Sequence, residues 1–478
     1  MQLDKVKGKD QAEAGKNFGV GKINAISLFS GAGGLDCGLE MSQKINIVLA
    51  NDIKRAPAET NSKNFNSRIE DAKTVREIGI NRTFALGDVT DIKFGELNIP
   101  NVEMIVGGPP CQDFSVIRGP QSERQGINVA RGKLYTQFVR ALCNLQPKFF
   151  LFENVPGLKT ANKHIAYETI VKDFSELNKR WIDIEKIAGD GANETVQGYD
   201  IIFSDIVDAT RFGVPQKRRR LLILGAKKGA LSPAQLESLA KTAEEKLKSR
   251  SLLLKYPLTP IEAFEGKTLD KLQEKYRDIM QEYADVAKQP KTKRAIAWKE
   301  NVWDKMKFDI VEDYKLINGI SNFSENEFAI ALKEHERILE SLGYLNKALD
   351  KTDFEDGTNK IILDSDSVMD RLKRTAPGEN YEFVTDSDLK GHGMSLIYRR
   401  IHPLKPSNTI VAFGGGGTWG YHYERNRGKL TNRERARLQS FPDSFIFAGK
   451  LSEVRAQIGE AVPPLLGYNV AELFMSLK

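Results

Sequence analysis

Short apolar runs, separated by longer mixed segments, dominate the chain from Ile23 to about Leu224. Each run is bounded by Gly, Asn, Pro or Asp, which is typical of buried strands. The alternation is that of βαβ units, so we expect an α/β fold with an open, mostly parallel sheet. The expected strands are Ala25–Phe29, Ile47–Ala50, Met104–Val106, Phe149–Phe152 and Leu221–Leu224.

Beyond Gly225 the chain changes to long charged stretches of helical composition, such as Ser232–Tyr256 and Leu269–Val286. A length of 478 residues is enough for two or three domains. We therefore predict a first domain over 1–225, a smaller inserted domain over 226–430, and a C-terminal segment over 431–478 that returns to the first sheet as a strand and a helix. Thr431 and Glu434 have the spacing of a capping box and predict a helix start.

Composition narrows the class of protein. The three cysteines have no paired spacing, so neither a disulfide framework nor a CxxC zinc site is expected, and we predict an intracellular protein without a metal. The polar amino-terminal segment lacks the apolar core of a signal peptide, and no stretch approaches the ~18 apolar residues of a membrane span. A formal net charge of +7 permits a polyanionic partner but does not establish one.

A glycine-rich loop, Phe29-Ser30-Gly31-Ala32-Gly33-Gly34, directly follows the first expected strand, and Asp52 ends the second. In doubly wound folds an acid about 20 residues past such glycines binds a ribose hydroxyl of an adenosine-type cofactor. The glycines are not in GxGxxG order, which favours a cofactor without a pyrophosphate, and S-adenosylmethionine is the natural candidate. Asp88 ends another strand-like element, where it could meet the adenine amino group. The alternative is an ordinary glycine turn between a strand and a helix.

Cys111 lies just past the strand Met104–Val106, after two prolines that restrict the backbone. Open α/β sheets present their ligand sites at this edge, so a rigidly presented thiol indicates a nucleophile. The alternative is a buried structural cysteine, which is the interpretation we prefer for Cys37 and Cys143.

Two further charged features adjoin expected strands. Glu153 ends the apolar strand Phe149–Phe152, where partial desolvation would favour its protonated form and suit it to share a proton; a structural ion pair is an equally good interpretation. In the basic run before Leu221, strand alternation would point Arg218 and Arg220 to one face. Such runs are usually solvated, but this one leads into a buried strand.

Together these blocks resemble the DNA (cytosine-5)-methyltransferases of bacterial restriction-modification systems. The motifs occur in the order typical of that family, with a long insert after Gly225. They are the glycine loop, Asp52, Gly87-Asp88-Val89, Pro110-Cys111-Gln112, Glu153-Asn154-Val155, Gln216-x-Arg218-x-Arg220, Arg400-Ile-His-Pro403 with Pro406-Ser-Asn-Thr-Ile410, Leu430–Asp443 and Gln457–Pro464.

The resemblance implies a role for each matching residue. Cys111 would be the nucleophile, Glu153 the partner of the target cytosine's N3 and amino group, and Arg218 and Arg220 contacts to the base or a nearby phosphate. The implied cofactor positions are Phe29, Ser30, Gly31, Gly33, Gly34, Asp52, Ile53, Asp88, Val89, Pro110, Leu134, Ala461 and Val462. The expected DNA contacts are Ser115, Arg118, Gln216, Arg399, Arg400 and Lys405.

The implied fold is the Rossmann-like, mostly parallel sheet of S-adenosylmethionine-dependent methyltransferases with a smaller inserted target-recognition domain. The implied reaction transfers a methyl group from S-adenosylmethionine to C5 of a cytosine flipped out of a short duplex DNA sequence. Gln112–Lys133 would be the loop that closes over the base. Asp52, Asn408 and Glu460 depart from the family's usual residues, and Glu460 adds a carboxylate to a loop expected at the cofactor pocket.

The resemblance also sets expectations about partners. We expect double-stranded DNA as substrate, a monomer in the bacterial cytoplasm acting near the nucleoid, no membrane, and a cognate restriction endonuclease as an option that requires no direct contact. A tRNA cytosine-5 methyltransferase is the rival enzyme, against which the long insert argues. A catalytically dead DNA-binding protein would be expected to lack Cys111 or Glu153, and a nicotinamide-dependent oxidoreductase would not explain either motif.

For the C-terminal segment we predict that Ala461 and Val462 line the cofactor pocket. Residues 465–478 would pack on the sheet as a helix, because Leu465, Leu466, Val470, Leu473 and Phe474 supply an apolar stripe. We also predict that the insert, about 226–395, and the segment Arg399–Tyr423 form a basic-faced lobe that grips the DNA major groove.

Overall fold

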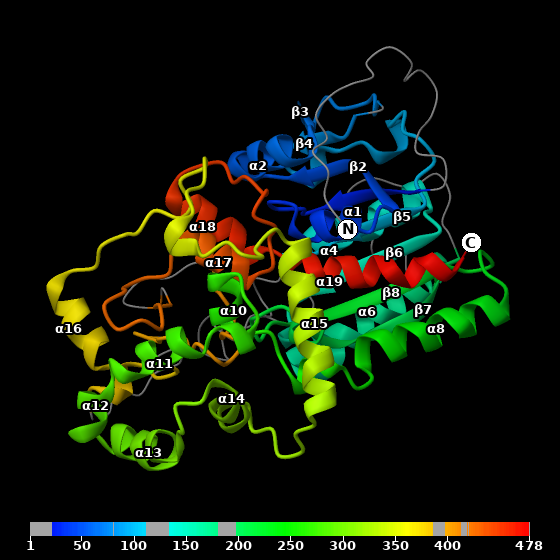
Figure 1. The fold of residues 1–478 in the computed structure, drawn as a ribbon. Coiled ribbons are helices and arrows are strands. Elements are labelled where there is room, and N and C mark those ends of the chain that lie inside the picture. Colours follow the sequence, from blue (N-terminus) through cyan, green and yellow to red (C-terminus); the bar gives the residue numbers. More distant parts are fainter. Residues whose placement is uncertain are drawn as a thin grey trace. The chain divides into compact units, whose positions relative to one another are not determined.

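The computed structural model describes residues 22–79, 81–110, 133–179, 197–385, 397–412, 418 and 420–477 (Figure 1). The described chain divides into two compact units. The sheet unit comprises the described residues of Asp4–Asp208, Arg219–Ser249 and Pro464–Lys478. The helical unit comprises Ala209–Arg218 and the described residues of Arg250–Pro463.

The described strands of the sheet unit form one eight-stranded sheet with the order β3-β4-β2-β1-β5-β6-β8-β7 (Figure 1). All pairs from β3 to β6 are parallel, and β8 is antiparallel to both β6 and β7. The strands are β1 Ile23–Leu28, β2 Ile45–Asp52, β3 Arg68–Asp71, β4 Thr83–Leu86, β5 Met104–Gly107, β6 Phe149–Asn154, β7 Tyr199–Asp208 and β8 Arg219–Lys227. The expected mostly parallel sheet and its five apolar strands are thus confirmed.

The core of the sheet unit is apolar and rich in phenylalanine. Phe150 and Phe152 of β6 pack with Phe138 of α4 and Phe174 of α6, at ring-centroid distances from 4.6 Å for Phe150–Phe174 to 6.3 Å for Phe138–Phe150. Parallel strands bury both faces, which explains why β1, β2, β5 and β6 read as continuous apolar runs. The helices of this unit are α1 Gly34–Met41, α2 Arg55–Phe65, α4 Lys133–Leu145, α5 Gly157–Thr160, α6 Ile165–Ser175, α8 Pro233–Lys248 and α19 Pro464–Ala471.

The helical unit has no extended sheet among its described residues, only isolated bridges such as Arg400 with Tyr421. Its core combines aliphatic side chains with buried aromatic ones, including Tyr256, Tyr276 and Tyr314. Its helices are α9 Leu252–Lys255, α10 Pro260–Glu265, α11 Gln273–Gln281, α12 Ala284–Lys288, α13 Lys293–Asn301, α14 Ile310–Asn318, α15 Glu325–Ser341, α16 Asp366–Arg374, α17 Asn432–Leu438 and α18 Leu451–Glu460. The predicted capping box is present at α17, where Thr431 and Glu434 each accept from the other's backbone N–H.

The compact units differ from the predicted domain boundaries at 225 and 430. Helix α8 belongs to the sheet unit, because Lys248 at its end pairs with Asp205 of β7 at 2.6 Å. Residues 431–463 belong to the helical unit, so only the segment from Pro464 returns to the sheet unit. That segment is the helix α19 followed by a 3-10 turn over Glu472–Leu477, and the strand expected near the C-terminus is instead the helix α18.

The returning helix packs against α1 at close range. A Cβ added to Gly38 of α1 would lie 1.9 Å from the Pro464 carbonyl oxygen, and one added to Gly467 of α19 would lie 2.7 Å from the Leu35 carbonyl oxygen. Only glycine allows two helix backbones to approach this closely. Leu465, Leu466, Val470, Leu473 and Phe474, the predicted apolar stripe, are all buried.

No helix in the described part of the chain combines the length and apolar character needed to span a bilayer.

Candidate active site

The glycine loop after β1 is tied to the end of β2 by Asp52. The Gly31 N–H donates to Asp52 Oδ2 at 3.0 Å, and the Lys54 N–H donates to Asp52 Oδ1 at 3.0 Å. The Ser30 N–H donates to the Asn51 carbonyl at 2.9 Å. The carboxylate therefore fixes the shape of the loop at the carboxyl edge of the sheet.

The loop needs glycine for two different reasons. Gly31 and Gly33 have φ values of 54° and 85°, in the left-handed region that favours glycine. A Cβ on Gly33 would also lie 2.9 Å from the Phe65 ring, whereas one on Gly31 would meet nothing within 4 Å. Gly33 is thus required for packing beneath the loop, while open space lies beside Gly31.

The next two parallel strands supply further residues at this edge. Ile53, directly after β2, is 64% exposed, which is unusual for a large aliphatic side chain beside a buried strand. The Asp88 carboxylate accepts from the Thr90 N–H at 2.9 Å and begins a short 3-10 turn with Val89. Asn51 holds the preceding chain by donating to the Ala85 and Gly87 carbonyls at 2.8 and 3.1 Å.

Arg140 of α4 supports the Asp88–Val89 turn from behind. Its buried guanidinium donates to the Val89 and Ile92 carbonyls, each at 2.9 Å, and lies over the Phe94 ring. The sequence interpretation missed this residue. An arginine amid Phe138, Val139, Ala141 and Leu142 of an apolar helix was the signal that could have found it.

Glu153 and Arg220 form a buried ion pair at the end of β6. Arg220 Nε lies 2.8 Å from Glu153 Oε1, and the two side chains are each 11% exposed. Burial lowers the pKa of Arg220 from its usual value, although the charge of Glu153 opposes this effect. A guanidinium remains protonated in proteins, so it fixes and orients the carboxylate.

The chain leading to Cys111 passes beside this ion pair. A Cβ on Gly108 would lie 2.5 Å from Glu153 Oε2, and the Asn154 side chain donates to the Pro109 carbonyl at 3.2 Å. Pro110 is exposed. Cys111, Ser115 and Arg118 lie outside the described residues, and Leu134, at the start of α4, is partly buried against the core.

The other two cysteines fit the structural interpretation. Cys37 and Cys143 are buried. Burial, reinforced by the Glu40 charge, raises the pKa of the Cys37 thiol to about 12, so almost no thiolate forms at neutral pH.

Several expected site residues belong to the helical unit, where they hold backbone segments. The predicted shared face of Arg218 and Arg220 is not observed, because Arg218 precedes β8 and donates to the Ile410, Gly459 and Ala461 carbonyls at 2.7–3.2 Å. Gln216 is fully buried, donates to the Leu438 carbonyl at 3.2 Å and accepts from the Ile410 N–H at 2.8 Å.

Arg400 was expected to contact DNA, but its side chain is fully buried. Its guanidinium donates to the carbonyls of Leu372 at 2.8 Å, Glu424 at 2.6 Å and His422. This placement does not fit a DNA contact. Arg399 is partly buried, and burial together with the Arg294 charge lowers its pKa.

The remaining expected positions of the helical unit differ in exposure. Lys405, Asn408 and Glu460 are exposed. Ala461 is partly buried and Val462 is buried. Their predicted place beside the cofactor stays a prediction.

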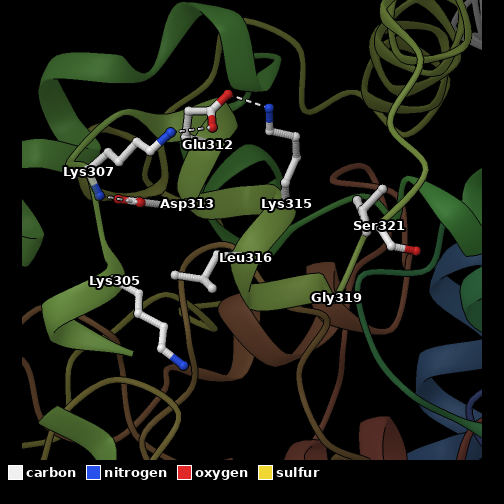
Figure 2. Close-up of a pocket in the computed structure, with 9 residues that line it drawn as sticks. Lys305, Lys307, Glu312, Asp313, Lys315, Leu316, Gly319 and Ser321 are labelled. Atoms are coloured by element: carbon white, nitrogen blue, oxygen red, sulfur yellow. Dashed lines mark hydrogen bonds and ion pairs between the residues drawn. The ribbon is translucent and has the colours of Figure 1, made fainter. Parts of the chain in front are cut away.

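An open pocket of about 470 Å³ lies in the helical unit around α14 (Figure 2). It carries Lys305, Lys307 and Lys315, and the last two both pair with Glu312 (Figure 2). These charges, of which Lys307 is 66% and Lys315 is 24% exposed, are typical of a solvated surface.

The model of the C-5 cytosine-specific DNA methylase family matches residues 23–475, almost the whole chain. The chain belongs to this family. The expected class of enzyme, a DNA (cytosine-5-)-methyltransferase, is thereby confirmed.

Similar proteins agree with this assignment. The chain is 48% identical to the DNA (cytosine-5-)-methyltransferase M.ApeKI of Aeropyrum pernix, over 94% of this chain and 98% of the relative. It is 30% identical to the type II methyltransferase M.NgoFVII of Neisseria gonorrhoeae, over 96% and 88%. A crystal structure described as a DNA modification methyltransferase encoded within an E. coli prophage has the same fold, with a TM-score of 0.52, 22% identity, and coverage of 95% of this chain and 99% of that one.

Proposed function

We propose that this enzyme methylates C5 of a cytosine within a specific short sequence of duplex DNA, using Cys111 as a covalent nucleophile on the flipped-out base. The observation that carries the proposal is the buried Glu153–Arg220 pair beside the Gly108–Pro110 segment that leads to Cys111. An ion pair that orients a carboxylate beside the segment that leads to a cysteine suits a reaction that must hold a pyrimidine ring and attack it.

Cytosine C5 is a weak nucleophile, so the ring must first be activated. The Cys111 thiolate adds to C6, and the new S–C6 bond moves electron density to C5. After C5 has received the methyl group, the C5 proton leaves to a base and the S–C6 bond breaks, which returns the thiolate. Because C6 is inaccessible inside a duplex, the base must leave the stack, at a cost of a few kcal/mol.

Glu153 holds the ring during this sequence. Its carboxyl shares a proton with N3 and accepts from the 4-amino group, which neutralises charge on the activated ring and rejects thymine. Arg220 fixes the orientation of that carboxyl through its Nε. The pair thus positions the base with groups that are already ordered before the substrate binds.

The residues at the sheet edge fit S-adenosylmethionine as the methyl donor. The space beside Gly31, the exposed Ile53 side chain and the Asp88 carboxylate provide room, an apolar contact and an acceptor for a nucleoside. When bound, this cofactor supplies an electrophilic methyl group on a sulfonium. Asp52 fixes the glycine loop, and Arg140 fixes the turn at Val89. These are the two segments that would hold the cofactor.

Labelled methyl transfer tests the substrate. Unmodified plasmid DNA is expected to accept label from S-[methyl-³H]adenosylmethionine, and bulk tRNA is not. Label on tRNA alone would overturn the DNA assignment in favour of the rival tRNA activity.

A duplex with 5-fluorocytosine at the methylated position tests the nucleophile. Fluorine cannot leave C5 as a cation, so the S–C6 bond should persist and survive denaturing electrophoresis. Cys111→Ser should form no adduct, because its hydroxyl supplies almost no anion at neutral pH. Glu153→Gln should slow methyl transfer while retaining DNA binding. An adduct that maps to Cys37 or Cys143 would contradict the mechanism.

The biological setting belongs to the same proposal. We place the enzyme in the cytoplasm, acting as a monomer on chromosomal DNA, with a restriction endonuclease of the same sequence specificity as a functional partner. Purification of an endonuclease that spares DNA methylated by this enzyme would support that pairing.

A further inference from the structure

Asp36 is a buried acid in the first turn of α1, the helix that begins where the glycine loop ends. The Ser27 hydroxyl of β1 donates to Asp36 Oδ1 at 2.6 Å, and the guanidinium of Arg82 pairs with Asp36 Oδ2. Both oxygens of this carboxylate therefore have a partner in the interior of the sheet unit.

Arg82 directly precedes β4, and its side chain is 5% exposed. Besides Asp36 it faces Glu40, with 3.6 Å between Arg82 Nη1 and Glu40 Oε2. Its guanidinium also lies over the Phe65 ring, 4.2 Å from the centroid. A Cβ on Gly33 would lie 2.9 Å from the same ring. The Phe65 ring thus connects the Arg82 guanidinium with the packing of the glycine loop.

Hydrogen bonding distinguishes Arg82 from Arg140, the buried arginine that supports the Asp88–Val89 turn. Arg140 donates to two backbone carbonyls, whereas Nε and Nη1 of Arg82 have no hydrogen-bond partner among the described residues. A buried ion pair with incompletely satisfied donors adds little net stability, because desolvation of the charges offsets their attraction. Stability is therefore a poor explanation for the Asp36–Arg82 pair, and its place in the sheet unit is more informative.

The pair connects the two strands that carry the proposed cofactor segments. Strand β1 leads into the glycine loop, β4 leads into Gly87 and Asp88, and β2 lies between these strands in the sheet. Because Ser27 belongs to β1 and Arg82 precedes β4, Asp36 joins both strands across β2. Strand pairing ends where the loops begin, so a link through the first turn of α1 limits movement of the glycine loop against the Asp88 turn.

We propose that Asp36 and Arg82 are positioning residues for S-adenosylmethionine, which hold the glycine loop and the Asp88 turn at the spacing that the cofactor requires. Both side chains are buried, so they act through the loops and not by touching the cofactor. A site that is ordered in advance avoids the entropy cost of arranging the loops during binding. The inference rests on the proposed function, because it requires S-adenosylmethionine as the methyl donor.

The decisive variant replaces both residues, Asp36→Asn together with Arg82→Met. Removing one partner would leave a buried charge unpaired and be strongly destabilising, whereas removing both charges is often nearly neutral for stability. Asparagine can still accept from the Ser27 hydroxyl, and methionine occupies much of the volume of arginine.

Tyr199→Phe is the matched control. It removes a buried hydrogen bond of the same unit, from the Tyr199 hydroxyl to the Pro147 carbonyl at 3.0 Å. Pro147 precedes β6, so this bond lies at the opposite edge of the sheet from the glycine loop. The control therefore reports what a loss of stability alone does to the reaction.

The full-length proteins are compared in methyl transfer to plasmid DNA, with denaturation midpoints measured alongside. In the double variant the KM for S-adenosylmethionine should rise about tenfold, as expected if the loops are correctly placed for only about a tenth of the time. The kcat at saturating cofactor and the KM for DNA should stay at the wild-type values. Tyr199→Phe should lower the denaturation midpoint and leave the KM for the cofactor unchanged.

Two measurements without DNA complete the test. Calorimetric titration should show the same rise, about tenfold, in the dissociation constant of S-adenosylhomocysteine for the double variant. Hydrogen exchange in the absence of cofactor should become faster in peptides that cover 29–36 and 86–91, while Phe149–Asn154 keeps its protection.

Each other outcome is decisive. If the wild-type protein neither binds S-adenosylmethionine nor methylates DNA, the proposed function fails. If the wild type is active and the double variant keeps its cofactor affinity, only the positioning role fails. If affinity falls together with protection throughout the sheet unit, including Phe149–Asn154, the pair is an ordinary stabilising contact and the positioning role is overturned. An equal rise in KM for Tyr199→Phe would overturn it as well.

Discussion

The two units differ in which groups donate hydrogen bonds to their buried backbone carbonyls. In the sheet unit, strand pairing provides partners for the carbonyls of the strands, and the interior is filled mainly by aromatic and aliphatic side chains, with the buried Arg140 donating to the Val89 and Ile92 carbonyls outside the strands. In the helical unit, connecting segments without strands pass through the interior, and buried arginines donate to their carbonyls. Arg437, for example, donates to the Ala263 and Lys347 carbonyls at 2.7 and 2.9 Å.

Other buried arginines of the helical unit also donate to backbone carbonyls. Its fully buried arginines are Arg218, Arg400, Arg433, Arg435 and Arg437. A guanidinium carries five donors in a fixed plane, so one side chain can serve several carbonyls that no sheet would reach. An arginine in a loop-rich unit is thus evidence for internal bonding as much as for a polyanionic ligand.

The largest expected effect follows from removing one of these donors. Arg400→Met should destabilise the helical unit by several kcal/mol, because the Leu372, His422 and Glu424 carbonyls lose the hydrogen bonds that it donates, at about 1–3 kcal/mol for each buried group left unsatisfied. Hydrogen exchange followed by mass spectrometry should show faster exchange in peptides spanning 397–430 and unchanged protection in Phe149–Asn154. Lys405→Met removes an exposed cation nearby and serves as control. Equal loss of protection in both units would contradict the comparison.

A substitution in the sheet unit should act through contact between backbones instead. Gly38→Ala places a methyl group against the Pro464 carbonyl, so α1 and α19 must separate, at a cost of about 1–3 kcal/mol. Chemical denaturation should show a lower midpoint, with lost protection in peptides of α1 and α19. Gly79→Ala serves as control, because this glycine of the same unit has open space around its Cβ and no positive φ. If Gly38→Ala is harmless, the close packing of α19 on α1 is wrong.

His335 offers a pH-dependent test in the helical unit. It is buried against Glu262, with Nδ1 2.9 Å from Glu262 Oε1, and although burial lowers its pKa, the Glu262 charge and hydrogen bond outweigh this and raise it. A raised pKa contributes stability that is fully present below the unfolded-state value and is lost as pH rises through the folded-state value. His335→Gln should cost on the order of 1 kcal/mol in mild acid, and the difference from wild type should shrink with rising pH. A difference that grows with pH would exclude the charged pair.

The smallest effect is expected where α8 joins the sheet unit. Burial alone would raise the pKa of Asp205, but hydrogen bonds from Lys159 and Lys248 hold it well below its usual range. Lys248→Ala should cost only about 0.2–1 kcal/mol, because the groups are partly exposed. Since the carboxyl pKa is depressed, this contribution should be lost as pH falls through the folded-state value, and salt should weaken it. Urea denaturation at several pH values measures it, with Lys241→Ala as control.

The sequence predicted the parts of the fold whose signal is local. Buried parallel strands are apolar on both faces, so β1, β2, β5 and β6 were visible as runs. The strands β3 and β7 were not, because Arg68–Asp71 and Tyr199–Asp208 mix charged and apolar residues as partly exposed edge strands do. The domain boundary near 225 was placed too early because α8 has the same charged composition as the insert that follows it.

For the site, the residues next to strand ends were predictable and the residues that support them were not. Glu153, Asp52 and the glycines occupy the edge where ligand sites form, and their positions follow from strand order. Arg220 was identified, but its pairing with Glu153 depends on the antiparallel register of β6 and β8, which no local pattern encodes. Arg400 was predicted to be a surface residue because a basic run beside glycines usually lies at a surface. Its side chain is instead buried by contacts with Leu372 and Glu424, which are 20 to 30 positions away in the chain.

The packing of α19 on α1 has a consequence for how the protein is made. A ribosome releases α1 long before the helix that covers it, Pro464–Ala471. The helical unit, Ala209–Arg218 with Arg250–Pro463, is translated in the interval, so it can complete its own interior first. Helix α1 is therefore covered only after the helical unit has been synthesised, and nascent chains stalled before Pro464 carry α1 without its cover.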